Sequence, residues 1–258
     1  MAGIEVERVV PRGRWHALED GEVVGRAYAL HRPDGRTFVA VDAWHAETGA
    51  ALLAAAVGEL PGPLFATVGE DDGDQLDLLG AAGFAEVRRE DELVVPVAAA
   101  LAATAPGTVP PGIALVPADG ADAAELARLD AELRRDTAGG EGWVVDVDAF
   151  RAYTFDTRHF DRETYLVAVV AATGEQAGLV RVWAHGRVPR LGLLGVRREH
   201  RRRGLGRALL HAALRPLAAR GVAEVSTEVD AADTVLRMLA ARLGARRTGG
   251  TVELRRPG

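Results

Sequence analysis

The sequence predicts a mixed α/β protein whose sheet is mostly antiparallel and is flanked by helices. Strand-like and helix-like segments alternate along the second half of the chain, which is typical of this class. Three consecutive strand-like runs within that half indicate antiparallel pairing, and the first half contains a shorter version of the same order. The chain has 258 residues, of which 48% are hydrophobic and 26% charged. This length and composition suit a globular protein with one large or two small domains.

The elements of the second half follow from periodicity and from turn residues. A strand is predicted at 112–118, and the helix after it covers 121–136 because Leu126, Leu129 and Leu133 recur on one face. The remaining predicted elements are a glycine-rich loop at 138–143, a helix at 146–156, strands at 164–173, 177–185 and 189–196, a helix from about Leu205 to Arg220, a strand at 223–229, a helix at 232–245 and a strand at 251–256.

The first half repeats this order in a shorter form. Its predicted elements are strands at 22–30 and 37–44, a helix at 47–60, a strand at 64–68, a helix at 73–84 and a strand at 92–97. The segments 72–84 and 233–245 both begin with an aspartate, and both run through a glycine into a strand. We therefore interpret the two halves as a degenerate internal repeat.

The segment between the two halves, 98–111, is rich in alanine and proline and has little charge. Residues before proline are pushed out of the helical region, so we predict an extended linker here. This places an N-terminal domain at 1–97 and a C-terminal domain at 112–258.

Several functions are excluded by what the composition lacks. The sequence has no cysteine, which excludes disulfides, thiolate zinc sites and cysteine nucleophiles. It also has no lysine, which excludes a Walker A phosphate loop and Schiff-base chemistry. The formal net charge of −6 gives no overall basic field that would favour nucleic acid. No apolar segment suits a signal peptide or a membrane span, so we expect a cytoplasmic protein that binds neither nucleic acid nor a membrane.

The segment 197-RREHRRRGLGRALL-210 carries the main functional signal. It follows a strand that is predicted to end at Val196, and it contains Gly204 and Gly206 where a helix is predicted to begin near Leu205. A helix N-terminus exposes unpaired N–H groups and a partial positive charge, so it attracts phosphate. The arginines before it add charge-assisted hydrogen bonds. The pattern therefore predicts a phosphate-binding loop.

Two other interpretations of the arginines compete with this one. A solvated arginine-rich loop would have no ligand at all. A nucleic-acid strip would favour interleaved aromatic residues, and none follows Trp183 in the sequence. A dinucleotide fingerprint is excluded because its third glycine is replaced by Leu209.

The R-x-x-G-x-G pattern at Arg201, Gly204 and Gly206 resembles the acyl-CoA loop of the GNAT superfamily of N-acyltransferases, and the resemblance extends over 112–258 in element order. It implies a GNAT-type sheet and acetyl-CoA as co-substrate, with no metal. The residues that it implies for coenzyme binding are Leu194, Gly195, Val196, Arg201, Arg202, Arg203, Gly204, Leu205, Gly206 and Arg207. The first half would be a degenerate GNAT-like domain, because its counterpart segment 44–53 has no arginine.

The resemblance also implies a catalytic base. In a branch of the family that acetylates protein N-termini, a glutamate on the last-but-one strand precedes an asparagine, and a tyrosine further on acts as the acid. Glu228 stands at the glutamate's place, Asp233 replaces the asparagine, and Ala240 stands where the tyrosine would be. We therefore expect Glu228 to act as the base, in an enzyme slowed by the missing acid. The alternative is that Glu228 is only a polar surface residue.

These features lead to a functional prediction. We expect an N-acetyltransferase that moves the acetyl group from acetyl-CoA to a primary amine by direct attack, because no cysteine can carry the group covalently. Trp143, Asp156 and His159 are the candidate acceptor-binding residues, since loops after the first helices commonly contact the acceptor in this superfamily. The acceptor is a small molecule or a peptide amine. A non-catalytic acyl-CoA-binding or regulatory module is the alternative that Ala240 suggests.

Overall fold

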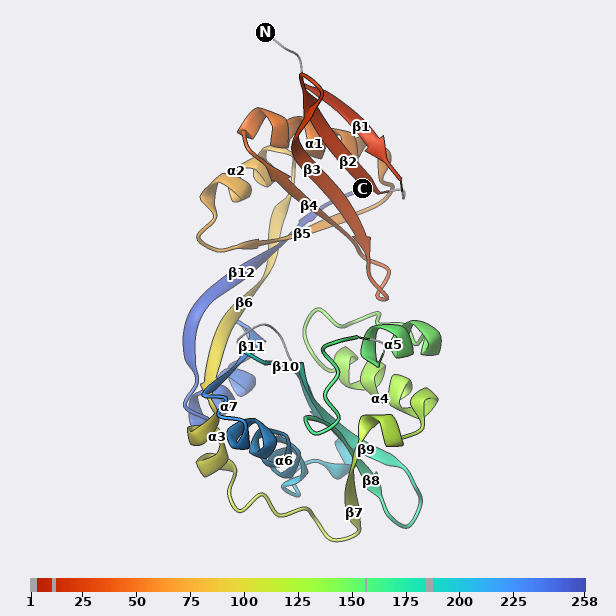
Figure 1. Ribbon diagram of the computed structural model, residues 1–258, viewed down its shortest axis with the longest axis vertical. Helices are drawn as coiled ribbons and strands as arrows, with labels where there is room; N and C mark the ends of the chain where they lie inside the picture. Colours follow the sequence, from red (N-terminus) through yellow and green to blue (C-terminus); the bar gives the residue numbers. More distant parts are fainter. Residues whose placement is uncertain (1–3, 11–12, 156, 184–187) are drawn as a thin grey trace. The chain divides into compact units, whose positions relative to one another are not determined.

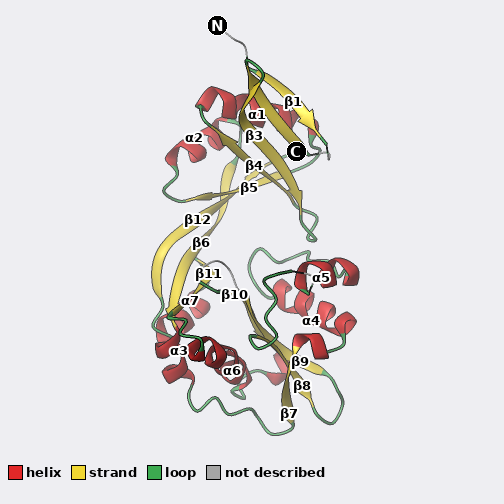
Figure 2. Ribbon diagram, viewed as in Figure 1, coloured by secondary structure: helices red, strands yellow, loops and turns green. Residues whose placement is uncertain are grey.

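A computed structural model describes residues 4–10, 13–155, 157–183 and 188–258 (Figure 1). The chain divides into two compact units: unit 1 contains residues 1–90 and 249–258, and unit 2 contains residues 91–248. Strands with helices packed on them make up both units (Figure 2), and most strand pairs are antiparallel. The predicted mixed α/β class is therefore confirmed. Among the described residues, no helix is long and apolar enough to cross a membrane.

Unit 1 is a mostly antiparallel set of strands with two helices. Its elements are β1 (Glu5–Val9), β2 (Arg14–Glu19), β3 (Glu22–His31), β4 (Thr37–Ala43), α1 (Ala46–Glu59), β5 (Leu64–Gly69), α2 (Gly73–Ala81), the start of β6 (Ala85–Pro96) and the end of β12 (Arg246–Arg256). The strand order is β1-β2-β3-β4-β5-β12. Helix α1 connects the parallel strands β4 and β5, and it buries Leu52, Leu53 and Ala56 in the core of this unit.

Unit 2 has the second sheet segment, with helices on both faces. Its further elements are α3 (Val97–Thr104), β7 (Ile113–Pro117), η1 (Ala118–Gly120), α4 (Ala123–Arg135), α5 (Val147–Thr154), β8 (Tyr165–Val170), β9 (Gln176–Trp183), β10 (Arg190–Val196), η2 (Arg198–His200), α6 (Leu205–Ala219), β11 (Glu224–Asp230) and α7 (Thr234–Arg242). The strand order is β6-β11-β10-β9-β8-β7.

The two faces of the sheet in unit 2 have separate cores. Alternate residues of a strand point to opposite faces, so Val180 of β9 packs with α6, whereas Leu179 packs with α4 and α5. Helix α4 comes very close to β10, because a Cβ atom at Gly195 would lie 2.8 Å from Leu133. The absence of a side chain at Gly195 therefore allows α4 to pack directly on the strand that leads into the arginine segment.

The predicted extended linker is wrong in its first part. Residues 97–104 form helix α3, whose Val97, Ala100 and Thr104 are buried in unit 2. Alanine is the best helix former, and the first proline, Pro106, comes only after the helix has ended. Alanine content here outweighs the nearby prolines.

The compact units also differ from the predicted domains. Strand β6 begins in unit 1 and ends in unit 2, and β12 begins in unit 2 and ends in unit 1. In each half the element before this last strand is a helix that follows an aspartate cap: Asp72 accepts from the amide of Gln75, and Asp233 from that of Leu236. The local repeat is present, but the last strand of each half contributes to both units.

Candidate functional site

Strands β10 and β11 separate after a short parallel contact. Their register is Arg190 opposite Ser226, and the hydroxyl of Thr227 donates to the carbonyl of Leu191 at 3.0 Å. Beyond Leu191, none of the described hydrogen bonds joins β10 to β11, although β10 continues to pair with β9 as far as Val196. One edge of residues 193–196 therefore has no strand partner, and apart from the carbonyl of Val196, which accepts from Arg201, an extended ligand can add there as a further strand. We refer to this open edge of β10, together with the facing part of β11, as the strand fork.

A β-bulge lies at the closed end of the strand fork. The register between β9 and β10 shifts between Leu191 and Leu193. A Cβ atom at Gly192 would lie 2.9 Å from the indole of Trp183 and 3.3 Å from Nη1 of Arg190. Both side chains therefore occupy the space above Gly192, and no larger residue fits there without displacing them.

The connection from β10 to α6, residues 197–204, forms the arginine loop. Its last residue, Gly204, has φ +83° and is the N-cap of α6 without a side-chain hydrogen bond. This left-handed conformation favours glycine. The first amides of α6, at Leu205, Gly206 and Arg207, have no acceptor within their own helix. A helical N–H donates to the carbonyl four residues earlier, and for these three residues that carbonyl lies before the helix begins. They form the partly positive end of a 15-residue helix.

Part of the arginine loop is held by acidic residues of α4 and its C-cap. Arg201 donates Nε to the carbonyl of Val196 at 2.8 Å and pairs with Asp136 through its guanidinium end. Arg198 pairs with the other carboxylate oxygen of Asp136 at 2.9 Å. The hydrogen bonds from Arg198 and then from Arg201 hold the pKa of Asp136 below its ordinary value. These two arginines therefore fix the base of the loop.

The other arginines of the segment fall into two groups, one paired with carboxylates and one without a described partner. Arg197 reaches two carboxylates, Glu132 and Glu175, at 3.2 Å each. Arg202, Arg203 and Arg207 are exposed, and no described residue pairs with any of them. Arg202 also has φ +60°, an unusual conformation for a residue with a side chain. The three unpaired cations lie next to the free amides of α6.

Glu228 lies on β11 at the closed end of the strand fork. Its carboxylate accepts from Nε of Arg190 at 2.8 Å, and its second oxygen lies 2.5 Å from Nη2 of the same guanidinium. The side chain of Glu228 remains 27% exposed. A substrate can therefore approach it, but it would find a carboxylate that is already paired. The role of Glu228 as a base stays a prediction.

Ala240, which stands where the tyrosine acid would be, lies in the apolar core. Ala240 is buried on α7 and packs with Leu93 and Val229. Tyr153 and Tyr165 lie on the α4 side of the sheet instead. Burial raises the pKa of Tyr153 to about 12, and it raises that of Tyr165 further, so both phenols are protonated at neutral pH.

The predicted acceptor residues lie in loops around α5. The guanidinium of Arg134 lies 4.3 Å from the ring centroid of Trp143, in the loop between α4 and α5. His159 is half-buried in the loop between α5 and β8. Asp156 lies outside the described residues. The role of these three residues in acceptor binding stays a prediction.

Sequence reasoning missed three residues near the bulge: Trp183, Arg190 and Arg181. Arg181 is only 1% exposed, and its Nη1 lies 2.7 Å from the carboxylate of Asp130, which is also buried. Its guanidinium lies 4.9 Å from the ring centroid of Trp183. An arginine within the apolar run 179-LVRVW-183 was the available signal, because an arginine is rarely buried without a partner.

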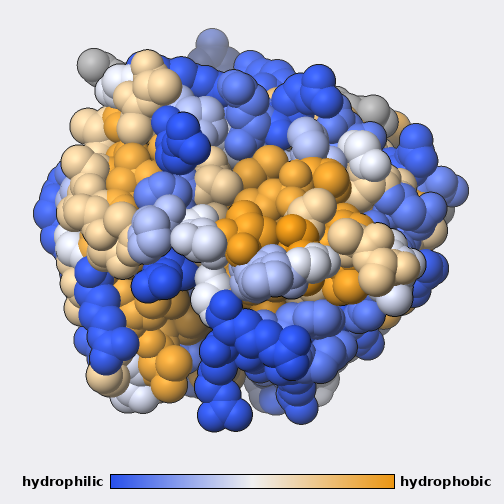
Figure 3. All heavy atoms as spheres, turned by 90° about the horizontal axis from the view of Figure 1, so that it is seen from below, coloured by the Kyte–Doolittle hydropathy of each residue, from blue (hydrophilic) through white to orange (hydrophobic). Residues whose placement is uncertain are grey.

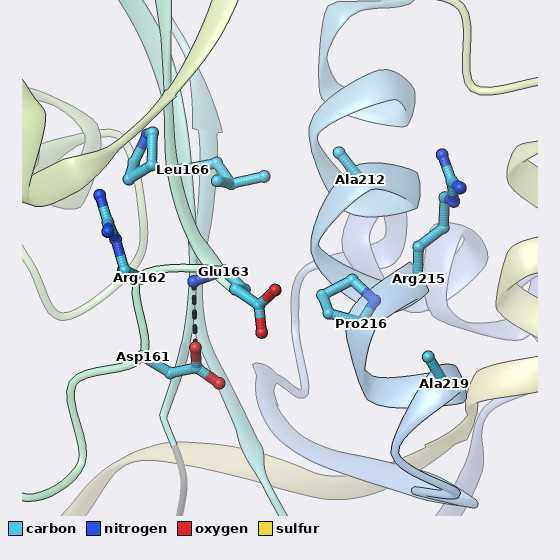
Figure 4. Close-up of a pocket in the computed structure, with 9 residues that line it drawn as sticks. Asp161, Arg162, Glu163, Leu166, Ala212, Arg215, Pro216 and Ala219 are labelled. Carbon is cyan, nitrogen blue, oxygen red and sulfur yellow. Dashed lines mark hydrogen bonds between the residues drawn. The ribbon is translucent and has the colours of Figure 1, made fainter.

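Two other places in unit 2 have features of a ligand site. Glu175, Glu199 and His200 bring their potential metal-binding atoms within 4.8 Å of one another, but Glu175 is already paired with Arg197. A hollow of about 790 Å³ lies beside α6 (Figure 4), where Leu166 points toward Ala212. Neither the acidic group nor the hollow contains a residue of the strand fork. Figure 3, a view from below, shows an apolar patch on the surface with hydrophilic residues around it.

Two carboxylates beside this hollow share one arginine. Asp161 and Glu163 both pair with Arg220 of the C-cap of α6, and the amide of Glu163 donates to Asp161 at 3.0 Å (Figure 4). These bonds raise the pKa of Arg220 above its ordinary value. The hollow therefore has an apolar floor, and its rim also carries two arginines, Arg162, which pairs with Asp119 at 3.5 Å, and the exposed Arg215.

Comparisons with known proteins add to this geometry. Residues 130–245 match the family model described as the acetyltransferase (GNAT) family. A search of curated proteins found no match to this chain. The solved structures that are similar include a GCN5-related N-acetyltransferase from Sphaerobacter thermophilus, with 23% identity and a TM-score of 0.63. The alignment covers 95% of this chain and 82% of that one.

Two further structures have the same fold. A tandem GNAT protein from the clavulanic acid biosynthesis pathway is 21% identical with a TM-score of 0.68, over 95% of this chain and 82% of that one. A GCN5-related N-acetyltransferase from Kribbella flavida is 19% identical with a TM-score of 0.55, over 98% of this chain and 90% of that one. Each alignment extends over both units, which agrees with the interpretation of the chain as a tandem arrangement.

Proposed function

We propose that the chain transfers an acetyl group from acetyl-CoA to the primary amine of an acceptor, on the premise that its residues 130–245 match the GNAT acetyltransferase family. The observation that carries the proposal is the combination of two features on one strand. β10 has an open edge at the strand fork, and it leads directly into a loop with unpaired arginines at a helix N-terminus. Together they suit a ligand with an extended amide-containing arm and a phosphate group.

The residues present fit acetyl-CoA. Its pyrophosphate suits the free amides of Leu205 and Gly206, with the cations of Arg202 and Arg203 beside them. The amides of its pantetheine arm suit the free backbone edge that ends at Val196. When bound, the coenzyme supplies the acyl group as a thioester.

The chain's own residues would act on the acceptor's proton. An ammonium group must lose a proton before its nitrogen can attack, and the carboxylate of Glu228 can accept that proton at the closed end of the strand fork. The guanidinium of Arg190 holds this carboxylate in place. Because the chain has no cysteine, transfer would proceed by direct attack rather than through a thioester to the protein. Solvent would supply the proton for the departing sulfur, since Ala240 cannot.

One test is an assay of acetyl-CoA-dependent thiol release with a panel of primary amines. We expect turnover with at least one class of amine, and we expect Glu228→Gln to lower kcat by about 100-fold or more, the lower end of the usual contribution of a general base. The matched control is Glu224→Gln on the same strand, because that carboxylate is also paired with an arginine, Arg246, at 3.1 Å. The control should keep the rate of the unmodified protein.

The alternative of a non-catalytic acyl-CoA-binding module is favoured by one observation, the burial of Ala240 in an apolar cluster. It predicts tight binding of acetyl-CoA in a calorimeter, with no thiol release for any amine. Equal rates for Glu228→Gln and the unmodified protein would also contradict the proposed role of the base.

A further inference from the structure

We propose that the acceptor carries a carboxylate next to its reactive amine, as an α-amino acid does. This inference rests on the proposed function and names the substrate class of the same site. Three residues at the closed end of the strand fork carry it: Arg190, Glu228 and Trp183.

The first observation is an accessible pair of opposite charges. Arg190 and Glu228 are joined by two contacts, of 2.8 Å and 2.5 Å, and their side chains are 39% and 27% exposed. A fully buried structural pair would be out of reach of a substrate. This pair lies at the surface of the fork, so a ligand can bind to both members without breaking them apart.

The second observation is a free donor on Arg190. Its Nε and Nη2 are used by Glu228, whereas its Nη1 lies 3.3 Å from the place of a Cβ atom on Gly192. No acceptor for Nη1 is found among the described residues. The guanidinium therefore offers a hydrogen bond to a second anionic group beside Glu228, and a fork-shaped guanidinium is well suited to a carboxylate.

The charge balance then selects the class of acceptor. The pair has no net charge, so a simple amine or a polyamine finds a carboxylate whose field Arg190 already cancels. A molecule with an ammonium and a carboxylate on the same carbon is complementary to both members at once, with the ammonium at Glu228 and the carboxylate at Nη1 of Arg190. Electrostatic complementarity of this kind gives specificity more than raw affinity.

Trp183 supplies a wall for the rest of the acceptor. Its indole lies against the bulge at Gly192, and the guanidinium of Arg181 lies over its ring, 4.9 Å from the centroid. Because Arg181 is paired with buried Asp130, this support adds no net charge to the site. The indole therefore presents a fixed apolar surface beside the charge pair.

The proposed reaction is balanced for such an acceptor. A bond forms between the amine nitrogen and the acetyl carbon, and the bond between that carbon and the coenzyme's sulfur breaks. The proton lost by the ammonium goes to Glu228, and solvent protonates the departing thiolate. The acceptor's carboxylate takes no part in these steps and serves only to position the amine.

The experiment compares acceptors that differ only in the carboxylate. The probes are glycine, L-glutamate, L-leucine and L-phenylalanine, each measured beside the amine that lacks its α-carboxylate. We expect the best amino acid to have a kcat/KM about 10- to 100-fold above that of its amine, which is the range for one hydrogen bond between charged groups. Arg190→Gln should reduce this ratio to about one by raising KM for the amino acid, and Arg190→Lys should restore part of it.

Each outcome decides between the two proposals. An exposed arginine without a described partner, Arg26 of unit 1, provides the control variant Arg26→Gln, which should keep the ratio. If the simple amines react as well as the amino acids, this inference is overturned while acetyl transfer stands. If the amino acids react better but Arg190→Gln keeps the ratio, the assignment to Arg190 is overturned. If no amine reacts although acetyl-CoA binds, the proposed function itself fails.

Discussion

The two units share a central arrangement in which a strand, a helix and a second, parallel strand follow one another, but only one of them has an arginine loop. In unit 1, β4 and β5 pair at Thr37 with Leu64, and α1 connects them after residues 44–45. In unit 2, β10 and β11 pair at Arg190, and eight residues precede α6. The arrangement of strand, helix and parallel strand thus occurs both with and without an arginine loop. The loop, rather than this arrangement, distinguishes unit 2 from unit 1.

The start of each helix shows this most directly. Helix α1 has Glu47 in its first turn and no arginine before it, so its N-terminus already has a negative partner. Helix α6 has no acidic residue in its first turn and follows Arg202 and Arg203. A phosphate would be repelled at the first helix and attracted at the second. We infer that unit 1 shares the strand–helix–strand arrangement of unit 2 but has no coenzyme site.

The paired ends of the strands differ as well. In unit 1 the rings of Phe38 and Phe65 lie 5.5 Å apart, and the guanidinium of Arg36 covers both. Arg36 pairs with Glu253, which is buried. At the same place in unit 2, Arg190 and its glutamate remain accessible. A similar arginine–glutamate pair therefore stabilises the fold in one unit and is open to a ligand in the other.

The largest effect on this difference between the units is expected from removing the unpaired cations of the arginine loop and of the first turn of α6. We expect replacement of Arg202, Arg203 and Arg207 by alanine to weaken acetyl-CoA binding by about 100-fold or more, since a hydrogen bond to a charged group contributes roughly 1.5–3 kcal/mol. Calorimetry gives the dissociation constant.

The matched control removes as many exposed arginines from unit 1. Arg14, Arg26 and Arg255 are exposed and have no described partner. Their replacement by alanine should leave acetyl-CoA binding unchanged. Equal weakening in both triple variants would mean that general charge, rather than the loop, attracts the coenzyme.

The loop itself could be predicted from the sequence, because its features are local. Gly204 permits the left-handed turn, and the periodicity after it indicates a helix. Both signals lie within a few residues of the loop. Which of the arginines pair with carboxylates and which stay unpaired could not be predicted. It depends on Asp136, which is 62 residues from Arg198 along the chain.

The closed end of the strand fork was out of reach for a related reason. Trp183 and Arg190 meet because a bulge places Gly192 between them, and no local pattern indicates a bulge at that residue. The shared strands β6 and β12 were missed because a strand's own residues do not specify which neighbour it pairs with. Element type was therefore predictable for many of the segments, although not for α3, whereas pairing and long-range contacts were not.

A smaller effect concerns the backbone of the arginine loop. Arg202 has φ +60°, and a left-handed conformation costs a residue with a side chain about 1–2 kcal/mol. Arg202→Gly relieves this cost but adds flexibility to the unfolded chain, so we expect a net gain of about 0.5–1 kcal/mol in the free energy of unfolding. Urea denaturation measures it.

The neighbouring arginine provides the comparison for that variant. Arg203 is not among the residues with positive φ, so Arg203→Gly should lower the free energy of unfolding by a similar amount. Both variants remove one unpaired cation, and both should weaken acetyl-CoA binding alike. A loss of stability in Arg202→Gly as large as that in Arg203→Gly would show that the conformation at Arg202 is not strained.

The smallest expected effect concerns the anchor of the loop and depends on pH. Hydrogen bonds from Arg198 and Arg201 lower the pKa of Asp136 in the folded protein. A carboxylate whose folded pKa is depressed stabilises the protein fully above its unfolded pKa, and this contribution disappears as the pH falls through the folded value. Asp136→Asn should therefore cost about 0.5 kcal/mol near neutral pH, as for other exposed pairs. The difference should begin to shrink as the pH falls through about 4 and should vanish only below the depressed pKa of Asp136 in the folded protein.

Glu86 in unit 1 separates the effect on stability from the effect on the loop. The hydrogen bond from Arg89 lowers the pKa of Glu86 in the same direction, so Glu86→Gln should show the same loss of stability near neutral pH. Only Asp136→Asn should also change acetyl-CoA binding, by a few-fold, because Arg201 then loses the partner that holds it beside the carbonyl of Val196. Unchanged binding in Asp136→Asn would show that the backbone turn at Gly204, and not the ion pairs, sets the shape of the loop.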